Sequence, residues 1–191
     1  DQFIKTATVA QQNNPAADRR TVLIHGQYLR EDQVASLEAL DIFPALYPMH
    51  TFYWGDWHRQ SVAGPERAEN ISPTGWLLDR DMKFSIHSDA PVTLPNSMRV
   101  LHSAVNRTTR SGATLGEYHR VDPLTAIKAM TIWPAYQHFE EDRKGSLEVG
   151  KLADLVILDK NPLTVERSEI QTIRVLETIK EGRTVFAADN Q

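Results

Sequence analysis

Three short apolar segments of this sequence are each followed by a side chain that can bind a metal ion. The segments and side chains are residues 22–24 with His25, residues 43–47 with His50, and residues 82–86 with Asp89. Short apolar runs are typical of strands buried on both faces, and residues 31–40 between the first two have helical spacing. We therefore predict an α/β fold with parallel strands, whose carboxyl ends bring the three side chains together.

The spacing along the chain fits adjacent strands for the first pair. His25 and His50 are separated by close to the roughly 30 residues of one βα unit. His50 and Asp89 are separated by more than one such unit and less than two. Any strand between them must be short, and the sequence leaves that strand unresolved.

Helical patterns fill much of the remaining sequence up to residue 140. Asp122 is the strongest start signal, because proline follows this N-cap residue at the first helical position. Ser97 is a second candidate N-cap. The predicted helices are residues 1–17 and 31–40, with further helices starting at Gly75, after Ser97, after Asp122 and at Thr131.

Aromatic residues are concentrated in residues 52–57. The stretch is too irregular for a tight connection, and we interpret it as a functional loop. Its large rings would form an apolar wall of a substrate pocket, and the alternative is a hydrophobic plug that packs the loop down. The candidate wall residues are Tyr53, Trp54 and Trp57.

From residue 145 onward the pattern changes to strands. Leu147 and Val149 alternate with polar residues, a turn follows, and residues 152–158 are mainly apolar, which predicts a β-hairpin over residues 145–159. A second hairpin is predicted from residues 175–179 and 184–186, joined through Glu181-Gly182.

Composition limits the partners and the metal ligands. The formal net charge is -4, and no Lys/Arg cluster is longer than the pair Arg19-Arg20, which argues against a nucleic-acid partner. No apolar run reaches about 18 residues, so no membrane span is predicted. The chain has no cysteine, so a metal must be bound by His, Asp, Glu or a modified lysine.

Arg67 and Arg107 are candidates for binding a substrate carboxylate, with surface ion pairs as the alternative.

Four motifs together resemble the amidohydrolase superfamily, in particular the amidohydrolase-3, YtcJ-like branch. They are Ile24-His25-Gly26-Gln27, Pro48-Met49-His50, Ser88-Asp89-Ala90-Pro91-Val92 and the run GSLEVGKLADLVILD at residues 145–159. In that branch similar motifs follow barrel strands five, six and eight and open the β-sandwich beside the barrel. The order and the contexts match here.

The resemblance implies the C-terminal half of a metallo-dependent hydrolase (β/α)8 barrel in residues 1–140 and part of a small β-sandwich in residues 141–191. It implies that His25 and His50 are metal ligands and that Asp89 is a ligand and the general base. The implied cofactor is a divalent metal, often zinc. The implied reaction is hydrolysis of a non-peptide C–N bond in a small-molecule substrate by a metal-activated water.

The sequence departs from the family pattern because it contains no His-x-His pair, which the family's first barrel strand supplies. The metal site is therefore expected to be incomplete, and the isolated chain to bind metal weakly and to be inactive. Open barrel edges favour homo-oligomers, so a self-associating structural or binding module is one alternative, and a catalytically dead homologue is another. Zinc, iron and manganese would all suit two histidines and an aspartate. His87 is expected to line the barrel floor, with a role as second base as the alternative.

Overall fold

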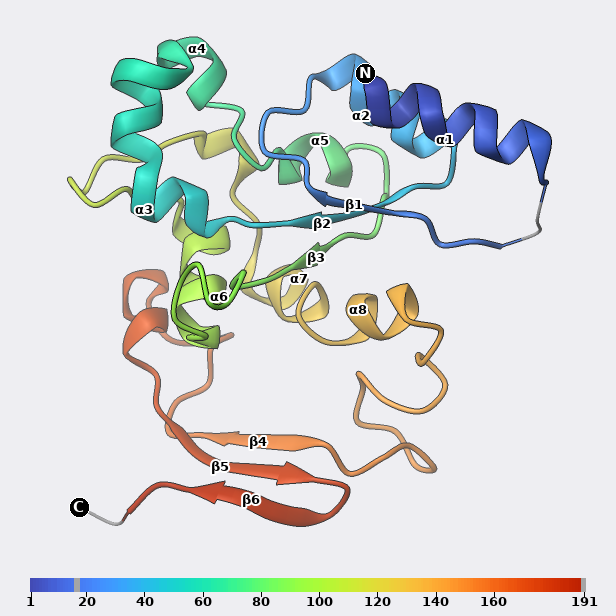
Figure 1. Cartoon of the computed structure of the whole chain (residues 1–191). Coiled ribbons are helices and arrows are strands. Elements are labelled where there is room, and N and C mark those ends of the chain that lie inside the picture. Colours follow the sequence, from blue (N-terminus) through green and yellow to red (C-terminus); the bar gives the residue numbers. More distant parts are fainter. Residues whose placement is uncertain (16–17, 190–191) are drawn as a thin grey trace.

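The computed structural model describes residues 1–15 and 18–189 and has an α/β fold (Figure 1). It begins with helix α1 (Gln2–Asn13), which confirms the helix predicted at the start of the chain. Residues 16 and 17, at the end of that prediction, lie outside the described part. None of the described helices is long and apolar enough to cross a membrane.

The three predicted strands form one parallel sheet. Adjacent in this order are β1 (Val22–His25), β2 (Phe43–Leu46) and β3 (Ser85–Ile86). Ala45 lies opposite Ser85, so β2 pairs directly with β3. The central strand β2 is buried along its whole length, as expected for a parallel strand covered on both faces. The sheet confirms the prediction, although β3 is shorter than residues 82–86.

The chain between β2 and β3 contains no strand and is mostly helical. It comprises α3 (Met49–Trp57), the π-helix η1 (His58–Val62), α4 (Gly64–Ala68) and α5 (Thr74–Leu78). The prediction of a loop over residues 52–57 is therefore wrong. Aromatic residues have a modest helix propensity, but Tyr53 and Trp54 pack against the hydrophobic core, and this burial stabilises the helix.

The remaining α-helices begin within one residue of their predicted starts, whereas the 3-10 helix η2 was not predicted. Asp122 caps its helix by accepting a hydrogen bond of 3.0 Å from the Thr125 N–H. In the helix after Pro95 the cap is Asn96, whose side chain accepts from the Arg99 N–H at 3.0 Å, so Ser97 is the first helical residue. These helices are α2 (Glu31–Ala39), α6 (Ser97–Asn106), the 3-10 helix η2 (Glu117–His119), α7 (Pro123–Lys128) and α8 (Ile132–Gln137).

The main hydrophobic core fixes the sheet against these helices. Leu46 of β2, Val34 and Leu37 of α2, and Leu101 of α6 belong to one cluster and are almost completely buried. Burying each such side chain contributes about 1.5–3 kcal/mol. The carboxyl ends of the strands are therefore held on a rigid support.

A second, antiparallel sheet follows, in the order β4-β5-β6 (Figure 1). Its elements are β4 (Leu155–Leu158), β5 (Val175–Lys180) and β6 (Arg183–Ala187), with the 3-10 helix η3 (Arg167–Thr172) after β4. The hairpin predicted over residues 145–159 is wrong, because β4 pairs with β5 and Leu147 and Val149 are exposed outside any strand. The β5–β6 hairpin is confirmed, and Glu181 and Gly182 both adopt the positive φ that a tight two-residue turn requires. The domain boundary between residues 140 and 141 stays a prediction.

Candidate metal centre

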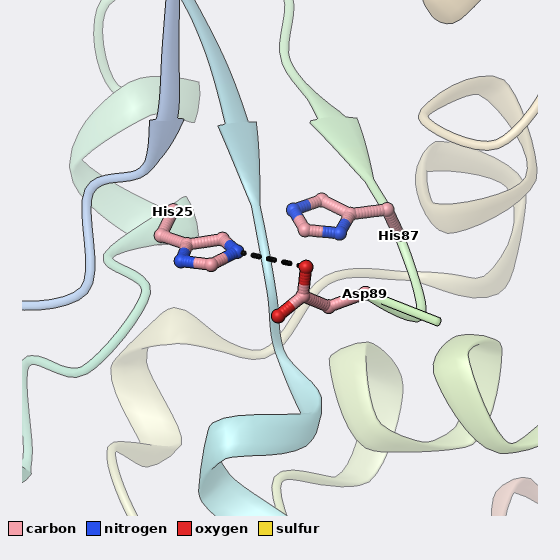
Figure 2. Close-up of side chains that lie close together, drawn as sticks. All are labelled: His25, His87 and Asp89. Atoms are coloured by element: carbon pink, nitrogen blue, oxygen red, sulfur yellow. Dashed lines mark ion pairs between the residues drawn. The ribbon is translucent and has the colours of Figure 1, made fainter. Parts of the chain in front are cut away.

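Three side chains from the carboxyl end of the parallel sheet meet in one cluster (Figure 2). His25, His87 and Asp89 each offer a ligand atom, and these atoms lie within 4.8 Å of one another. His25 Nε2 is 3.4 Å from Asp89 Oδ1. The rings of His25 and His87 stack, with centroids 5.1 Å apart and planes inclined by 16°. Two residues predicted to meet, His25 and Asp89, are therefore brought together.

The ends of two strands place these side chains. His25 is the last residue of β1, and His87 directly follows β3, where its N–H donates to the Leu46 carbonyl of β2 at 3.1 Å. His25 and Asp89 have φ angles of 68° and 52°, a left-handed conformation that residues other than glycine adopt rarely. Both side chains thus lie at sharp backbone turns, where unusual conformations are often associated with function.

His50 lies beside this cluster but outside the group of three. It stands in the first turn of α3, directly after β2, and its ring centroid is 5.6 Å from that of His25 in an edge-to-face arrangement. The sequence prediction thus placed His50 in the right neighbourhood. The expectation that His87 lines the barrel floor is wrong, because His87 follows the carboxyl end of β3, and its imidazole, rather than that of His50, completes the three-residue group.

The donor atoms fit a metal ion. His25 Nε2, His50 Nδ1 and His87 Nε2 are buried and have no hydrogen-bond partner among the described residues. Buried polar side-chain atoms in folded proteins almost always have a partner, and unpartnered nitrogens at one place call for an explanation. A divalent cation would supply the missing partner, because imidazole nitrogen and carboxylate oxygen are suitable ligands for zinc and similar metals.

Burial also sets the charge of the imidazoles. Burial, together with the neighbouring His25 and His58, lowers the pKa of His50 to about 4. Burial likewise lowers the pKa of His87, with a contribution from His25. Both rings are therefore neutral at pH 7, and neutral imidazole is the form that binds metals.

Tyr47 was not singled out from the sequence, because it ends an apolar segment and looks like a core residue. It is completely buried, and its ring contacts all three histidines of the site, with centroids 5.9 Å from His25, 4.5 Å from His50 and 5.6 Å from His87. Its hydroxyl donates to Thr93 Oγ1 at 2.8 Å.

The three aromatic candidates occupy different environments. Trp54 lies against the site, with its ring centroid 6.0 Å from that of His50. Tyr53 packs against Trp54 and the hydrophobic core, whereas the Trp57 side chain is 56% exposed. Their role as a substrate-pocket wall stays a prediction.

The two arginine candidates also lie in different environments. Arg67 is exposed on α4 and lines a surface cavity. Arg107 is completely buried, and its guanidinium donates to the carbonyl oxygens of Ile71, Ser72 and Leu115. Both interpretations of Arg107, substrate ligand and surface ion pair, are therefore wrong, and its role is to join the end of α6 to residues 71–72 and to Leu115.

His119 gives a testable pH dependence. It is 1% exposed, its Nδ1 accepts from the Gly75 N–H at 3.1 Å, and its Nε2 lies 3.0 Å from the Asn70 side-chain oxygen. Burial, together with the charge of Arg107, lowers its pKa to about 3. Below about pH 6.5 the unfolded chain takes up a proton that the folded chain refuses, so stability falls as the pH falls.

Because of His119, we expect the free energy of unfolding to fall by about 3 kcal/mol when the pH is lowered from 7 to 4. Urea denaturation at both pH values measures the change. His119→Gln should lower stability at pH 7. It should also reduce by about one the number of protons that the chain takes up on unfolding at acidic pH, so stability should depend less on pH. His138→Gln, which changes an exposed histidine at the end of α8, is the matched control. Parallel pH profiles for the wild type and His119→Gln would contradict the assignment.

Known proteins resemble the chain over nearly its whole length. The model of the amidohydrolase family matches residues 1–186. An N-substituted formamide deformylase from Arthrobacter pascens is 28% identical over 174 residues, which are 91% of this chain and 32% of that protein.

Solved structures of metal-dependent enzymes share the fold. A crystal structure of an uncharacterized metal-dependent hydrolase from Pyrococcus horikoshii matches with a TM-score of 0.71 at 22% identity, over 88% of this chain and 34% of that chain. An adenosine deaminase from Xanthomonas campestris with bound zinc matches with a TM-score of 0.62 at 19% identity, over 88% and 38%. The chain thus spans about a third of the length of these relatives. The family match over almost every residue confirms the resemblance of the motifs, and the chain belongs to the amidohydrolase family.

Proposed function

We propose that this chain contributes the metal site of a hydrolase that cleaves non-peptide, amide-type C–N bonds in a small molecule. The observation that carries the proposal is the set of buried imidazole nitrogens beside Asp89 that have no hydrogen-bond partner in the described part of the chain. Membership of the amidohydrolase family and the fold of metal-dependent hydrolases support it.

The ligands of the proposed divalent metal are His25, Asp89 and at least one of His50 and His87. The first two are common to the motif resemblance and to the geometry, whereas the motifs favour His50 and the distances favour His87 as the third. Zinc is the proposed ion, because neutral imidazoles and a carboxylate form typical zinc sites. A structural relative with bound zinc supports this choice.

When bound, such a metal brings the pKa of a coordinated water toward about 7 and polarises a carbonyl oxygen. The protein's own residues do the rest. Asp89 Oδ1, next to His25 Nε2, accepts the proton of the attacking water and returns it to the leaving nitrogen as the C–N bond breaks and a C–O bond forms. Tyr47 and the buried rings around it exclude bulk water, which strengthens electrostatic interactions in the site.

The proposal includes the architecture of the whole chain. Residues 1–140 would be the C-terminal half of a (β/α)8 barrel and residues 141–191 part of a β-sandwich. Because the sequence contains no His-x-His pair, the 191-residue chain by itself would bind metal weakly and turn over nothing.

Amine release tests the function. The substrates are N-substituted formamides and N-acyl amines, and the protein is assayed both as the 191-residue chain and extended to the length of its relatives. We expect the extended, zinc-loaded protein to release amine, the same protein stripped of metal to release none, and the short chain to be inactive. Amine release that persists without metal, or no release from any amide by the zinc-loaded protein, would argue against the proposal.

Self-association is a second candidate function, and the exposed sheet residues favour it. Ile24 of β1 and Val156 and Val185 of the second sheet expose more than half of their side chains, and β1 is an edge strand. Exposed edges that carry apolar side chains promote pairing with another chain. Sedimentation analysis should show a dimer or larger species at tens of micromolar, and a clean monomer there would count against this candidate.

A further inference from the structure

We infer that Tyr47 and Thr93 form a positioning pair that holds Asp89 in place for the proposed hydrolysis. The inference rests on the proposed function for its catalytic consequence. Its structural basis is a chain of hydrogen bonds that leads from the wall of the histidine cluster to the backbone next to Asp89.

The hydrogen-bond chain is short and buried. The Tyr47 hydroxyl donates to Thr93 Oγ1 at 2.8 Å, and Thr93 Oγ1 donates to the Ser88 carbonyl at 2.6 Å. Tyr47 is completely buried, and Thr93 is 7% exposed. Because each hydroxyl donates one hydrogen bond, the direction is fixed: Tyr47 orients Thr93, and Thr93 fixes the peptide group between Ser88 and Asp89.

This peptide group decides where the Asp89 carboxylate lies. Asp89 has a φ of 52°, and such a conformation persists only where the surrounding structure holds it. The described contacts hold it from both sides, since the His87 N–H donates to the Leu46 carbonyl at 3.1 Å and the Val92 N–H donates to the Asp89 carbonyl at 2.7 Å. The Thr93 hydrogen bond supplies the third fixed point, at the Ser88 carbonyl.

The hydroxyl of Tyr47 explains why this position has a tyrosine and not a phenylalanine. Its ring packs against the three histidines, which phenylalanine would do equally well. Its hydroxyl has one described partner, Thr93, so the hydrogen-bond chain is the feature that distinguishes tyrosine from phenylalanine at this position. The hydroxyls of Tyr47 and Thr93 thus act through the backbone next to Asp89.

Four variants test the pair in the extended, zinc-loaded protein. Tyr47→Phe and Thr93→Val each remove one hydroxyl and keep most of the volume, and each should lower kcat and zinc affinity about 10- to 100-fold, with KM within about twofold of the wild type. The double variant should be no worse than the worse single variant, because both hydroxyls act through one chain of hydrogen bonds. Thr93→Ser keeps the hydroxyl and should restore kcat.

Thr109→Val is the matched control. Thr109 is 2% exposed, its hydroxyl bonds to Ser111 Oγ at 3.0 Å, and its side chain has no described hydrogen bond to His25, His87 or Asp89. This variant should lose thermal stability and leave kcat and zinc affinity unchanged. It separates the loss of a buried hydroxyl as such from the loss of the positioning contact.

Three results would overturn the inference: wild-type kcat and zinc affinity in Tyr47→Phe, no rescue in Thr93→Ser, or effects that multiply in the double variant. If the wild type hydrolyses no amide, the proposed function fails, and the pair is then judged by zinc affinity alone. Unchanged zinc affinity in Tyr47→Phe would reject it in that case.

Discussion

Asp89→Asn should lower kcat by about 10²- to 10⁴-fold at saturating zinc, because an amide cannot accept the proton of the attacking water or return it to the leaving nitrogen. Asparagine has the shape of aspartate and tolerates the left-handed conformation that residue 89 adopts, so the backbone should not change. The measurement is the rate of amine release as a function of substrate and zinc concentration.

Asp81→Asn is a suitable control for this prediction. Asp81 also has a positive φ, of 53°, and lies in the turn after α5, away from the histidine cluster. This variant should keep wild-type kcat and zinc affinity. An Asp89→Asn protein that retains more than about a tenth of wild-type kcat would exclude Asp89 as the general base.

Arg107→Met should lower the unfolding free energy by about 3–5 kcal/mol. The Arg107 guanidinium donates to the carbonyls of Leu115 at 2.8 Å and Ser72 at 3.2 Å and also to that of Ile71, and methionine would leave all three without this partner in a buried site. Burial lowers the pKa of Arg107 to about 9, so the side chain is still charged at pH 7. Urea denaturation at pH 7 measures the change.

The effect of Arg107→Met should also reach the metal centre. The Ser72 N–H donates to the Gln27 carbonyl at 3.0 Å, and the Ser72 hydroxyl donates to the Tyr47 carbonyl at 3.2 Å. Ser72 thus joins the chain segments that follow β1 and β2, so loosening it should weaken zinc binding. Arg110→Met removes an exposed guanidinium nearby and should cost about 0.5 kcal/mol or less. A change below about 1 kcal/mol for Arg107→Met would contradict the account of this side chain.

The sequence was sufficient to predict the parallel sheet and the polar ends of its strands. The apolar runs before His25 and His50 are short and favour strands, and parallel strands carry their carboxyl-terminal residues to the same edge. The Asp122 cap and the β5–β6 turn were also predictable, because both depend on residues that are close in the sequence. The N-cap side chain accepts a hydrogen bond from its own helix, and the turn needs a glycine that adopts a positive φ.

Other features depend on tertiary contacts that no local pattern records. Leu147 and Val149 alternate as in a strand, yet alternation forms no strand without a partner, and β5 is the partner of β4. Residues 52–57 form a helix because Tyr53 and Trp54 are buried by the core.

In the candidate site, too, the sequence predicted only some of the residues. His87 stands two residues before Asp89, and this proximity suggested a role as second base only as an alternative to lining the barrel floor. For Tyr47 the sequence holds no such sign, since the role of its hydroxyl depends on Thr93, far along the chain.

Zinc titration of the purified chain, followed by competition with a chromophoric chelator, tests the central claim that His25, His87 and Asp89 belong to a metal centre. The account predicts one zinc ion per chain, bound more weakly than about 1 µM, and loss of this binding in the His25→Ala, Asp89→Ala double variant. Single His50→Ala and His87→Ala variants then identify the third ligand. Equal zinc binding by the wild type and the double variant, or no binding by the wild type at millimolar zinc, would contradict the account.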